Sequence, residues 1–258
     1  GQAPPGQSQA PPGQGQAAPD RAGAVWCRAL DRDGSLPEDI GMNPILHHEF
    51  VVADGHRPER WMFVLAGIFG AGRNWASVAR RFVRARPEWG CVLVDLRQHG
   101  ASQGFHPPHT VPACVDDLRR LAHHLETGAE AKPVEAILGH SFGGKVALQF
   151  AAAVSADPSA PLLREVWVVD STPSAREPEG SAWGMLRVLR EAPGPFESRE
   201  AAVEAVERFG FHRAVGLWMS TNLVPVANDA SEAGLVWRLD PDAMESLLRS
   251  FFAIDAWQ

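Results

Sequence analysis

The segment VEAILGHSFGGKVALQF, residues 134–150, joins a short apolar run to an apolar helical pattern through a glycine-rich turn. Residues 134–138 predict a buried strand, and residues 142–154 predict a helix. The pentapeptide between them, GHSFG at 139–143, fits the G-x-S-x-G spacing of a sharp strand-to-helix turn. This spacing has a mechanical reason, because glycine two residues before and after the serine lets the strand and the helix approach closely.

Ser141 is therefore the strongest candidate for chemistry in this chain. We expect its backbone to be strained and its Oγ to stand exposed above the edge of a sheet. The helix that begins behind it offers unpaired N–H groups and the positive end of a dipole, which suit a carbonyl that gains negative charge on attack. An ordinary glycine-rich turn is the alternative. The strands and helices on both sides favour instead a turn that presents Ser141 as a nucleophile, and residues 139–143 are called the nucleophile turn below.

Strand and helix patterns alternate from about residue 47, which is typical of a mostly parallel sheet covered on both faces. The predicted strands are residues 47–53 at an edge, 61–65, 91–95, 134–138 and 165–169, and the predicted helices are 75–86, 111–126 and 142–154. After Asp170 the pattern becomes amphipathic and helical around residues 186–190, 201–209 and 244–252, without another convincing strand. This later stretch predicts a helical cap over the site.

Length and composition indicate one large folded domain behind a low-complexity extension. The chain has 258 residues, of which 45% are hydrophobic and 21% charged, enough to bury a sizeable core. The tandem APPGQSQ and APPGQGQ at residues 3–16 carries no large apolar side chain, so residues 1–24 are predicted to be disordered. The core of the α/β fold is assigned to residues 25–182 and the cap to residues 183–258.

Charge and cysteine usage exclude several classes of protein. The formal net charge of -7, without a long basic cluster, argues against nucleic-acid binding. Cys27, Cys91 and Cys114 are widely spaced and form no C-x-x-C pair, so we expect reduced thiols in an intracellular setting and no metal site. No apolar stretch approaches the roughly 18 residues that span a bilayer.

A second glycine-rich stretch, LAGIFGAG at residues 65–72, follows a predicted strand, where open α/β sheets place their ligands. There the backbone N–H of Ile68 would pair with that of Phe142 to form an oxyanion hole. Further residues predicted to belong to the site or its loops are Gly67, Phe69 and His140. A phosphate-binding loop is the alternative, but the stretch lacks the Lys-Ser/Thr of a P-loop and the G-x-G-x-x-G spacing.

The stretch DLRQHGAS, residues 95–102, follows the next predicted strand. Charged residues in a tight turn more often tie neighbouring loops together through hydrogen bonds than take part in catalysis. We therefore predict a structural role, with His99 as general base being the weaker alternative.

These blocks together make the chain resemble the α/β-hydrolase superfamily. Within it, the chain is similar to the esterase family of bacterial YbfF-type enzymes, mitochondrial abhydrolase-domain proteins and their plant relatives. The blocks that carry the resemblance are GIFG at 67–70, RNW at 73–75, VDLRQHG at 94–100, GHSFGGKVA at 139–147, VDSTP at 169–173, TNLV at 221–224, VWR at 236–238 and DA at 242–243. The resemblance implies a serine hydrolase that cleaves carboxylic esters, thioesters or lipid-like esters through an acyl-enzyme, without a cofactor, and a location that includes mitochondria or plastids.

The chain departs from that family at three residues and in the position of its histidines. Ala66 stands where the family has histidine, and Gln98 and Ala101 stand where it has asparagine and arginine. The family's catalytic histidine follows two further strands, whereas here no histidine follows His212. We therefore expect a fragment that ends before the general base and has weak or no turnover. A binding or partner-interaction protein that has lost catalysis is the alternative.

Two aspartates are candidates for the acid that orients the base. Asp170 follows a predicted strand beside the nucleophile turn, and Asp242 matches a position assigned as the acid in some members of the family. Geometry favours Asp170, because Asp242 lies beside Pro241, where the start of a helix is a sufficient explanation. His212 is a remote candidate for the base.

Overall fold

The computed structural model describes Gly1 and residues 44–128, 131–158, 160–226 and 234–257. The chain divides into two units, residues 1–42 and 43–258, and all elements below belong to the second. The predicted disordered extension and Cys27 lie outside the described residues. Cys91 and Cys114 are buried free thiols.

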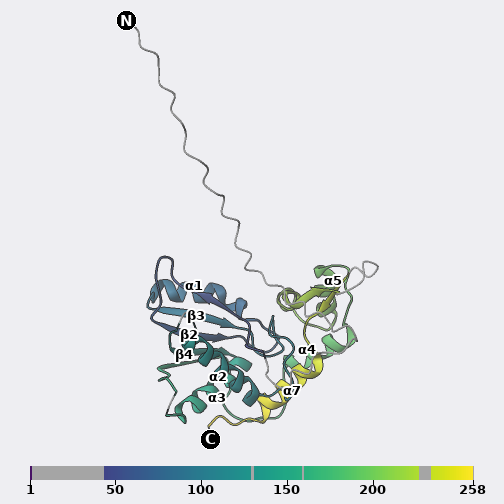
Figure 1. Cartoon of the computed structure of the whole chain (residues 1–258). Coiled ribbons are helices and arrows are strands. Elements are labelled where there is room, and N and C mark those ends of the chain that lie inside the picture. Colours follow the sequence, from purple (N-terminus) through teal and green to yellow (C-terminus); the bar gives the residue numbers. More distant parts are fainter. Residues whose placement is uncertain (2–43, 129–130, 159, 227–233, 258) are drawn as a thin grey trace, which may run out of the picture. The chain divides into compact units, whose positions relative to one another are not determined.

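A five-stranded sheet forms the centre of the second unit (Figure 1). In order across the sheet, the strands are β1 (His48–Val51), β3 (Trp89–Val94), β2 (Arg60–Leu65), β4 (Val134–His140) and β5 (Glu165–Val169). β1 pairs antiparallel with β3 at one edge, and the other pairs are parallel. β2 and β3 are buried almost throughout, as expected for parallel strands that are covered on both faces.

Helices cover both faces of the sheet (Figure 1). α1 (Ala76–Ala85) packs on one face, and α2 (Val111–Thr127) and α3 (Phe142–Ser155) pack on the other. The alternation along β2 explains this division: Met62 and Val64 join the apolar cluster of α1, whereas Phe63 and Leu65 join that of α2 and α3. The predicted strands and the first three helices are therefore confirmed, with bounds that shift by one or two residues at most ends.

The segment after β5, residues 181–253, is called the cap region here. It contains α4 (Ser181–Glu191), α5 (Arg199–Arg208), α6 (Arg213–Met219), β6 (Leu223–Pro225), β7 (Leu235–Trp237) and α7 (Pro241–Ala253). The expectation of no further strand is wrong, because β6 and β7 pair antiparallel. Each has three residues, too few for alternation to stand out against the helical patterns. The predicted boundary between core and cap stays a prediction.

The β5 edge of the sheet is only partly covered. At the β5 edge, four apolar side chains are 37–48% exposed: Val166, Trp167, Val168 and Val169. In the described part of the chain, β5 pairs with β4 alone. The strand that ends at Asp170 is therefore much less enclosed than the strand that ends at the nucleophile turn.

Candidate active site

Ser141 stands at the junction of β4 and α3 with φ 51° and ψ -117°. Side-chain-bearing residues rarely adopt a positive φ, so this backbone is strained as predicted. The N–H of Ser141 donates to the carbonyl of Val169 at 2.9 Å, and its carbonyl accepts from the N–H of Gly144 at 2.9 Å. The neighbouring strand β5 and the following helix α3 therefore both hold the turn.

The two glycines of the motif are required on steric grounds. A Cβ atom on Gly139 would overlap the carbonyl group of Gly143, and one on Gly143 would overlap the carbonyl oxygen of Ala66. Both obstacles are backbone atoms, which cannot rotate away. The geometry confirms that strand and helix approach closely at this turn.

The loop over residues 67–70 lies directly against Ser141. A Cβ atom on Gly67 would lie 3.2 Å from Cβ of Ser141 and 3.1 Å from Nδ1 of His140. The loop is tight, since the N–H of Gly70 donates to the carbonyl of Gly67 at 3.0 Å and Phe69 has φ 66°. The cap region supports it as well, because Nδ2 of Asn222 donates to the carbonyl of Phe69 at 2.9 Å.

Ser141 lines a hollow of about 450 Å³. Core residues that line it are Ala66, Gly67, Ile68, Phe69, Gly70, Asn74, Trp75, His140 and Ser141. Cap residues that line it are Ser181, Ala182, Met185, Phe211, Val215 and Trp218. Among the described residues, the lining includes no Asp, Glu, Lys or Arg side chain. Sequence patterns did not reveal the cap residues of this lining, because nothing in their local sequence distinguishes them from other residues of amphipathic helices.

Ile68 and Phe142 flank the serine from two elements. Ile68 lines the hollow from the loop after β2. Phe142 is the first residue of α3, where backbone N–H groups have no acceptor within the helix. Its side chain is buried, with its ring centroid 6.3 Å from that of His99 and 6.0 Å from that of Phe251.

The structure places the two candidate acids differently. The register of β4 and β5 pairs His140 with Val169, so that Ser141 and Asp170 follow at the same end of neighbouring strands. Asp170 has φ 47° and is exposed, and no described side chain hydrogen-bonds to its carboxylate. Asp242, by contrast, is 86% exposed, accepts from Nη2 of Arg190 at 2.7 Å and does not line the hollow.

Among the residues that line the hollow, His140 is the single histidine, with its ring centroid 5.7 Å from that of Trp75. His99 is 1% exposed, and this burial lowers its pKa. His212 is exposed and caps α6, where its Nδ1 accepts from the N–H of Ala214 at 3.1 Å. Neither His99 nor His212 lines the hollow.

The segment 95–102 holds loops together, as predicted. Asp95 accepts from the N–H groups of Gly72 and Ala101, each at 2.8 Å, and lies 3.0 Å from Nδ1 of His47. Arg97 donates two bonds to the carboxylate of Asp117, at 2.6 and 2.9 Å, and both side chains are almost fully buried. This segment therefore supports the site from behind and does not face the hollow.

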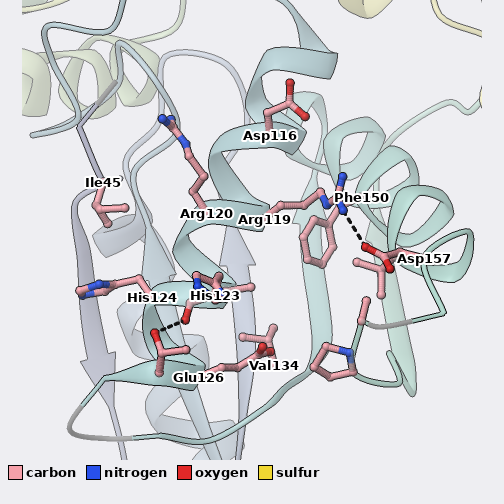
Figure 2. Close-up of a pocket in the computed structure, with 15 residues that line it drawn as sticks. Ile45, Asp116, Arg119, Arg120, His123, His124, Glu126, Val134, Phe150 and Asp157 are labelled. Atoms are coloured by element: carbon pink, nitrogen blue, oxygen red, sulfur yellow. Dashed lines mark hydrogen bonds and ion pairs between the residues drawn. The ribbon is translucent and has the colours of Figure 1, made fainter. Parts of the chain in front are cut away.

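A larger hollow, of about 720 Å³, lies over α2 and α3 (Figure 2). Its lining is strongly charged, and one ion pair within it joins Nη2 of Arg119 to Oδ2 of Asp157 at 2.8 Å. None of the described residues that line it belongs to the nucleophile turn or to the loop over residues 67–70. Size alone would favour this hollow as the active site. The strained serine lines the smaller hollow, which is therefore the candidate active site.

Comparison with known proteins now adds to this geometry. Residues 62–258 match the model of the alpha/beta hydrolase family. The chain belongs to this family. Its fold and the position of its strained serine turn agree with the resemblance that the sequence motifs indicated.

Two relatives of this α/β hydrolase are both named sn-1-specific diacylglycerol lipase ABHD11. The one from Danio rerio is 26% identical over 224 residues, which cover 85% of this chain and 65% of the relative. The one from Xenopus tropicalis is 33% identical over 151 residues, which cover 57% of this chain and 42% of the relative. The chain thus spans less than two thirds of the length of these curated relatives.

Solved structures support the same fold. A marine microorganism esterase superposes with a TM-score of 0.64 at 19% identity, covering 81% of this chain and 74% of that one. An E-2-(acetamidomethylene)succinate hydrolase superposes with a TM-score of 0.58 at 23% identity, covering 82% and 70%. In the described residues of this α/β hydrolase, no helix is long and apolar enough to cross a membrane, and no group of three acidic, histidine or cysteine side chains is placed to hold a metal ion.

Proposed function

We propose that this α/β hydrolase cleaves carboxylic esters with Ser141 as its nucleophile. The observation that carries the proposal is the strained backbone of Ser141 at a strand–helix junction, with its side chain lining a hollow. Attack by Oγ on an ester carbonyl would place negative charge on the carbonyl oxygen. The backbone N–H groups of Ile68 and Phe142 are proposed to receive that oxygen, because they flank the serine from the two sides of the site.

The proposed reaction has two stages. Oγ attacks the carbonyl carbon while a base takes its proton, and the base returns that proton to the leaving oxygen as the tetrahedral intermediate expels the alcohol, which leaves an acyl-enzyme. Water then attacks the acyl-enzyme and releases the acid. In both stages the base is an imidazole, and Asp170 is proposed to orient it, because Asp170 follows β5 at the same sheet end as Ser141.

The lack of a positioned base limits the turnover rate that we expect for this chain. No histidine follows His212 in the sequence, and the single histidine of the hollow, His140, directly precedes Ser141. Without a positioned base, a serine hydrolase loses several orders of magnitude in kcat. We therefore propose slow acylation and turnover far below the 1–1,000 s⁻¹ that is common for enzymes, by roughly a thousandfold or more.

The lining of the hollow suggests the class of substrate. Aliphatic and aromatic side chains from both core and cap dominate it, with no ionisable side chain other than that of His140. Burying a charged substrate group there would be costly, because nothing would pair with its charge. An uncharged ester with an apolar or lipid-like acyl chain therefore fits best, in keeping with relatives that are named as lipases.

A binding or partner-interaction protein is the second candidate. It is favoured by one observation: no described side chain hydrogen-bonds to Oγ of Ser141, so none of the described residues activates this hydroxyl. Such a protein would keep the hollow and bind uncharged apolar molecules without cleaving them.

Labelling with a fluorophosphonate probe tests the proposal. We expect slow covalent labelling of the wild-type chain and none of Ser141→Ala, with mass spectrometry placing the adduct on residue 141. Ser155→Ala is a matched control, because Ser155 is exposed at the end of α3 and does not line the hollow, so its loss should leave labelling unchanged. Labelling that survives Ser141→Ala would refute the assignment. No labelling, together with saturable binding of an uncharged alkyl ester, would support the binding protein instead.

A further inference from the structure

Lys145 is a buried ionisable side chain that the proposed reaction does not use. It lies on α3, four residues after Ser141, and its side chain is 0% exposed. Lysine is almost never fully buried unless its ammonium group is hydrogen-bonded, since removing the charge from water is costly. Its partners therefore indicate its role.

The ammonium group of Lys145 donates three hydrogen bonds to backbone carbonyls. Its Nζ lies 3.0 Å from the oxygen of Ser174, 2.7 Å from that of Phe251 and 2.9 Å from that of Ile254. An ammonium group has three protons, so all are used and none remains for a substrate. Nζ also lies 4.4 Å from the centroid of the Phe251 ring, which favours the cation further.

Burial lowers the pKa of Lys145, and the nearby Arg176 acts in the same direction. Asp255 opposes this effect. The three carbonyl oxygens also oppose it, because they bind the charged form of the side chain. The local contacts are thus arranged to keep a buried ammonium group in place.

The three carbonyls belong to the segment that leads into the cap region and to the C-terminal end of that region. Ser174 lies between β5 and α4, whereas Phe251 and Ile254 lie at the C-terminal end of α7. The last carbonyls of a helix have no partner within it, and a positive charge there complements the helix dipole. Lys145 therefore supplies from α3 the donor that the end of α7 lacks.

The same two segments also bind each other. The N–H of Arg176 donates to the carbonyl of Phe252 at 3.0 Å, and the N–H of Ala256 donates to the carbonyl of Pro173 at 2.8 Å. The chain that enters the cap region and the chain that leaves it thus run side by side where Lys145 contacts both.

We propose that Lys145 is a positioning residue that clamps both ends of the cap region to the helix behind Ser141. Ser141 and Lys145 are about one helical turn apart on a continuous element, so the clamp fixes the cap side of the hollow relative to the serine. The clamp itself is independent of ester chemistry. Its consequence for substrate binding rests on the proposed function.

Lysine NMR tests the clamp in the wild-type chain, which contains just two lysines, Lys132 and Lys145. After labelling with 15N-lysine, we expect an ammonium resonance from Lys145 whose protons exchange slowly with water. It should persist in Lys132→Met, the matched control, and disappear in Lys145→Met. Methylation with formaldehyde and borohydride should modify Lys145 at least tenfold more slowly than Lys132. Rapid proton exchange at both lysines and equal methylation would overturn the proposal.

Hydrogen exchange then tests whether Lys145 positions the cap region. In Lys145→Met, the amides of Arg176 and Ala256 should exchange at least tenfold faster, whereas those of β2 and β3 keep their rates. Lys145→Arg, which keeps the charge, should restore part of the protection. Unchanged exchange at Arg176 and Ala256 would refute the clamp. If Lys145→Met does not fold, Lys145→Arg and the wild-type NMR decide. None of these outcomes depends on whether Ser141 reacts with a fluorophosphonate.

Discussion

The two halves of the candidate site differ in how many contacts hold them in place. The nucleophile half, formed by Ser141 and the loop over residues 67–70, is tied to a neighbouring strand, a helix and the cap region through hydrogen bonds. The acid half, formed by Asp170 at the end of β5, is exposed, and no described side chain pairs with its carboxylate. Both residues have a positive φ, and hydrogen bonds to Val169 and Gly144 hold the backbone of Ser141 in this conformation.

The difference follows from the position of the two strands in the sheet. β4 is paired on both sides, by β2 and β5, whereas β5 is paired with β4 alone in the described residues. Strained backbone persists where its surroundings over-determine it. The comparison teaches that contacts among the described residues hold the nucleophile turn, whereas no described side chain holds the carboxylate of Asp170.

The largest expected effect comes from the support behind the nucleophile half. Arg97→Met breaks the buried pair with Asp117 and leaves a buried carboxylate with fewer donors, which should cost about 3–5 kcal/mol in the free energy of unfolding. Urea unfolding followed by circular dichroism measures this. Arg190→Met, which removes two ion pairs at the surface of the cap region, is the matched control and should change little. Equal losses for the two variants would contradict the comparison.

The nucleophile turn itself is the next place to break. Gly143→Ala forces a Cβ atom against the carbonyl of Ala66, which should cost about 1–3 kcal/mol and abolish fluorophosphonate labelling of Ser141. Gly55→Ala is the control, because Gly55 has φ +72° with open space around it. It should cost about 1 kcal/mol through backbone strain alone and leave labelling intact. Labelling that survives Gly143→Ala would show that the close approach is not needed.

Acidic pH should lower the free energy of unfolding through His99, the buried histidine whose ring stacks on that of Phe142. Burial lowers the pKa of His99, so below pH about 6.5 the unfolded chain binds a proton that the folded chain resists. Stability should therefore fall as the pH drops through 6.5, with a contribution of up to about 1.4 kcal/mol per pH unit from this residue. Urea unfolding between pH 8 and pH 5 measures the slope.

His99→Gln is the matched variant for this pH dependence. His48 and His109 also have pKa values lowered by burial, so part of the slope should remain in the variant. The difference between the two slopes isolates His99. Identical slopes would show that protonation of His99 does not oppose folding.

The smallest effect is expected in the acid half. Asp170→Asn should change the free energy of unfolding by less than about 0.5 kcal/mol, because the side chain is exposed and Asn tolerates a positive φ. Asp95→Asn is the same chemical change in an enclosed setting, where a carboxylate accepts from two backbone N–H groups, and should cost about 1.5–3 kcal/mol. Thermal unfolding compares the two. A similar cost for both would mean that Asp170 is held by contacts like those of Asp95.

Most of the sheet and its first helices could be predicted from the sequence because they have strong local patterns. β2 and β3 are largely apolar runs, and α2 is capped by Thr110, whose side chain accepts from the N–H of Ala113 at 3.3 Å. β6, β7 and α6 have three to seven residues, and α6 contains Gly216, so their local signals are weak. Their structure comes from packing against neighbours.

The candidate site divides in the same way. The positions of Ser141, Ile68 and Phe142 follow from glycine spacing, because the close approach of two backbones is a local steric requirement. The position of Asp170 beside Ser141 follows from the register of β4 with β5, and the exposure of Asp242 follows from the packing of α7. The sequence identifies both aspartates as candidates for the acid, but it does not show where either side chain lies in the fold.

The sequence by itself determined a strained serine turn, the parallel sheet that presents it and the family to which the chain belongs, since glycine sterics and hydrophobic periodicity act over a few residues. The tertiary structure alone decided which cap residues line the hollow and which carbonyls Lys145 contacts. Met185 and Trp218 lie far from Ser141 in the chain, as Ile254 does from Lys145. Such long-range contacts depend on how whole elements pack together, which no local pattern records.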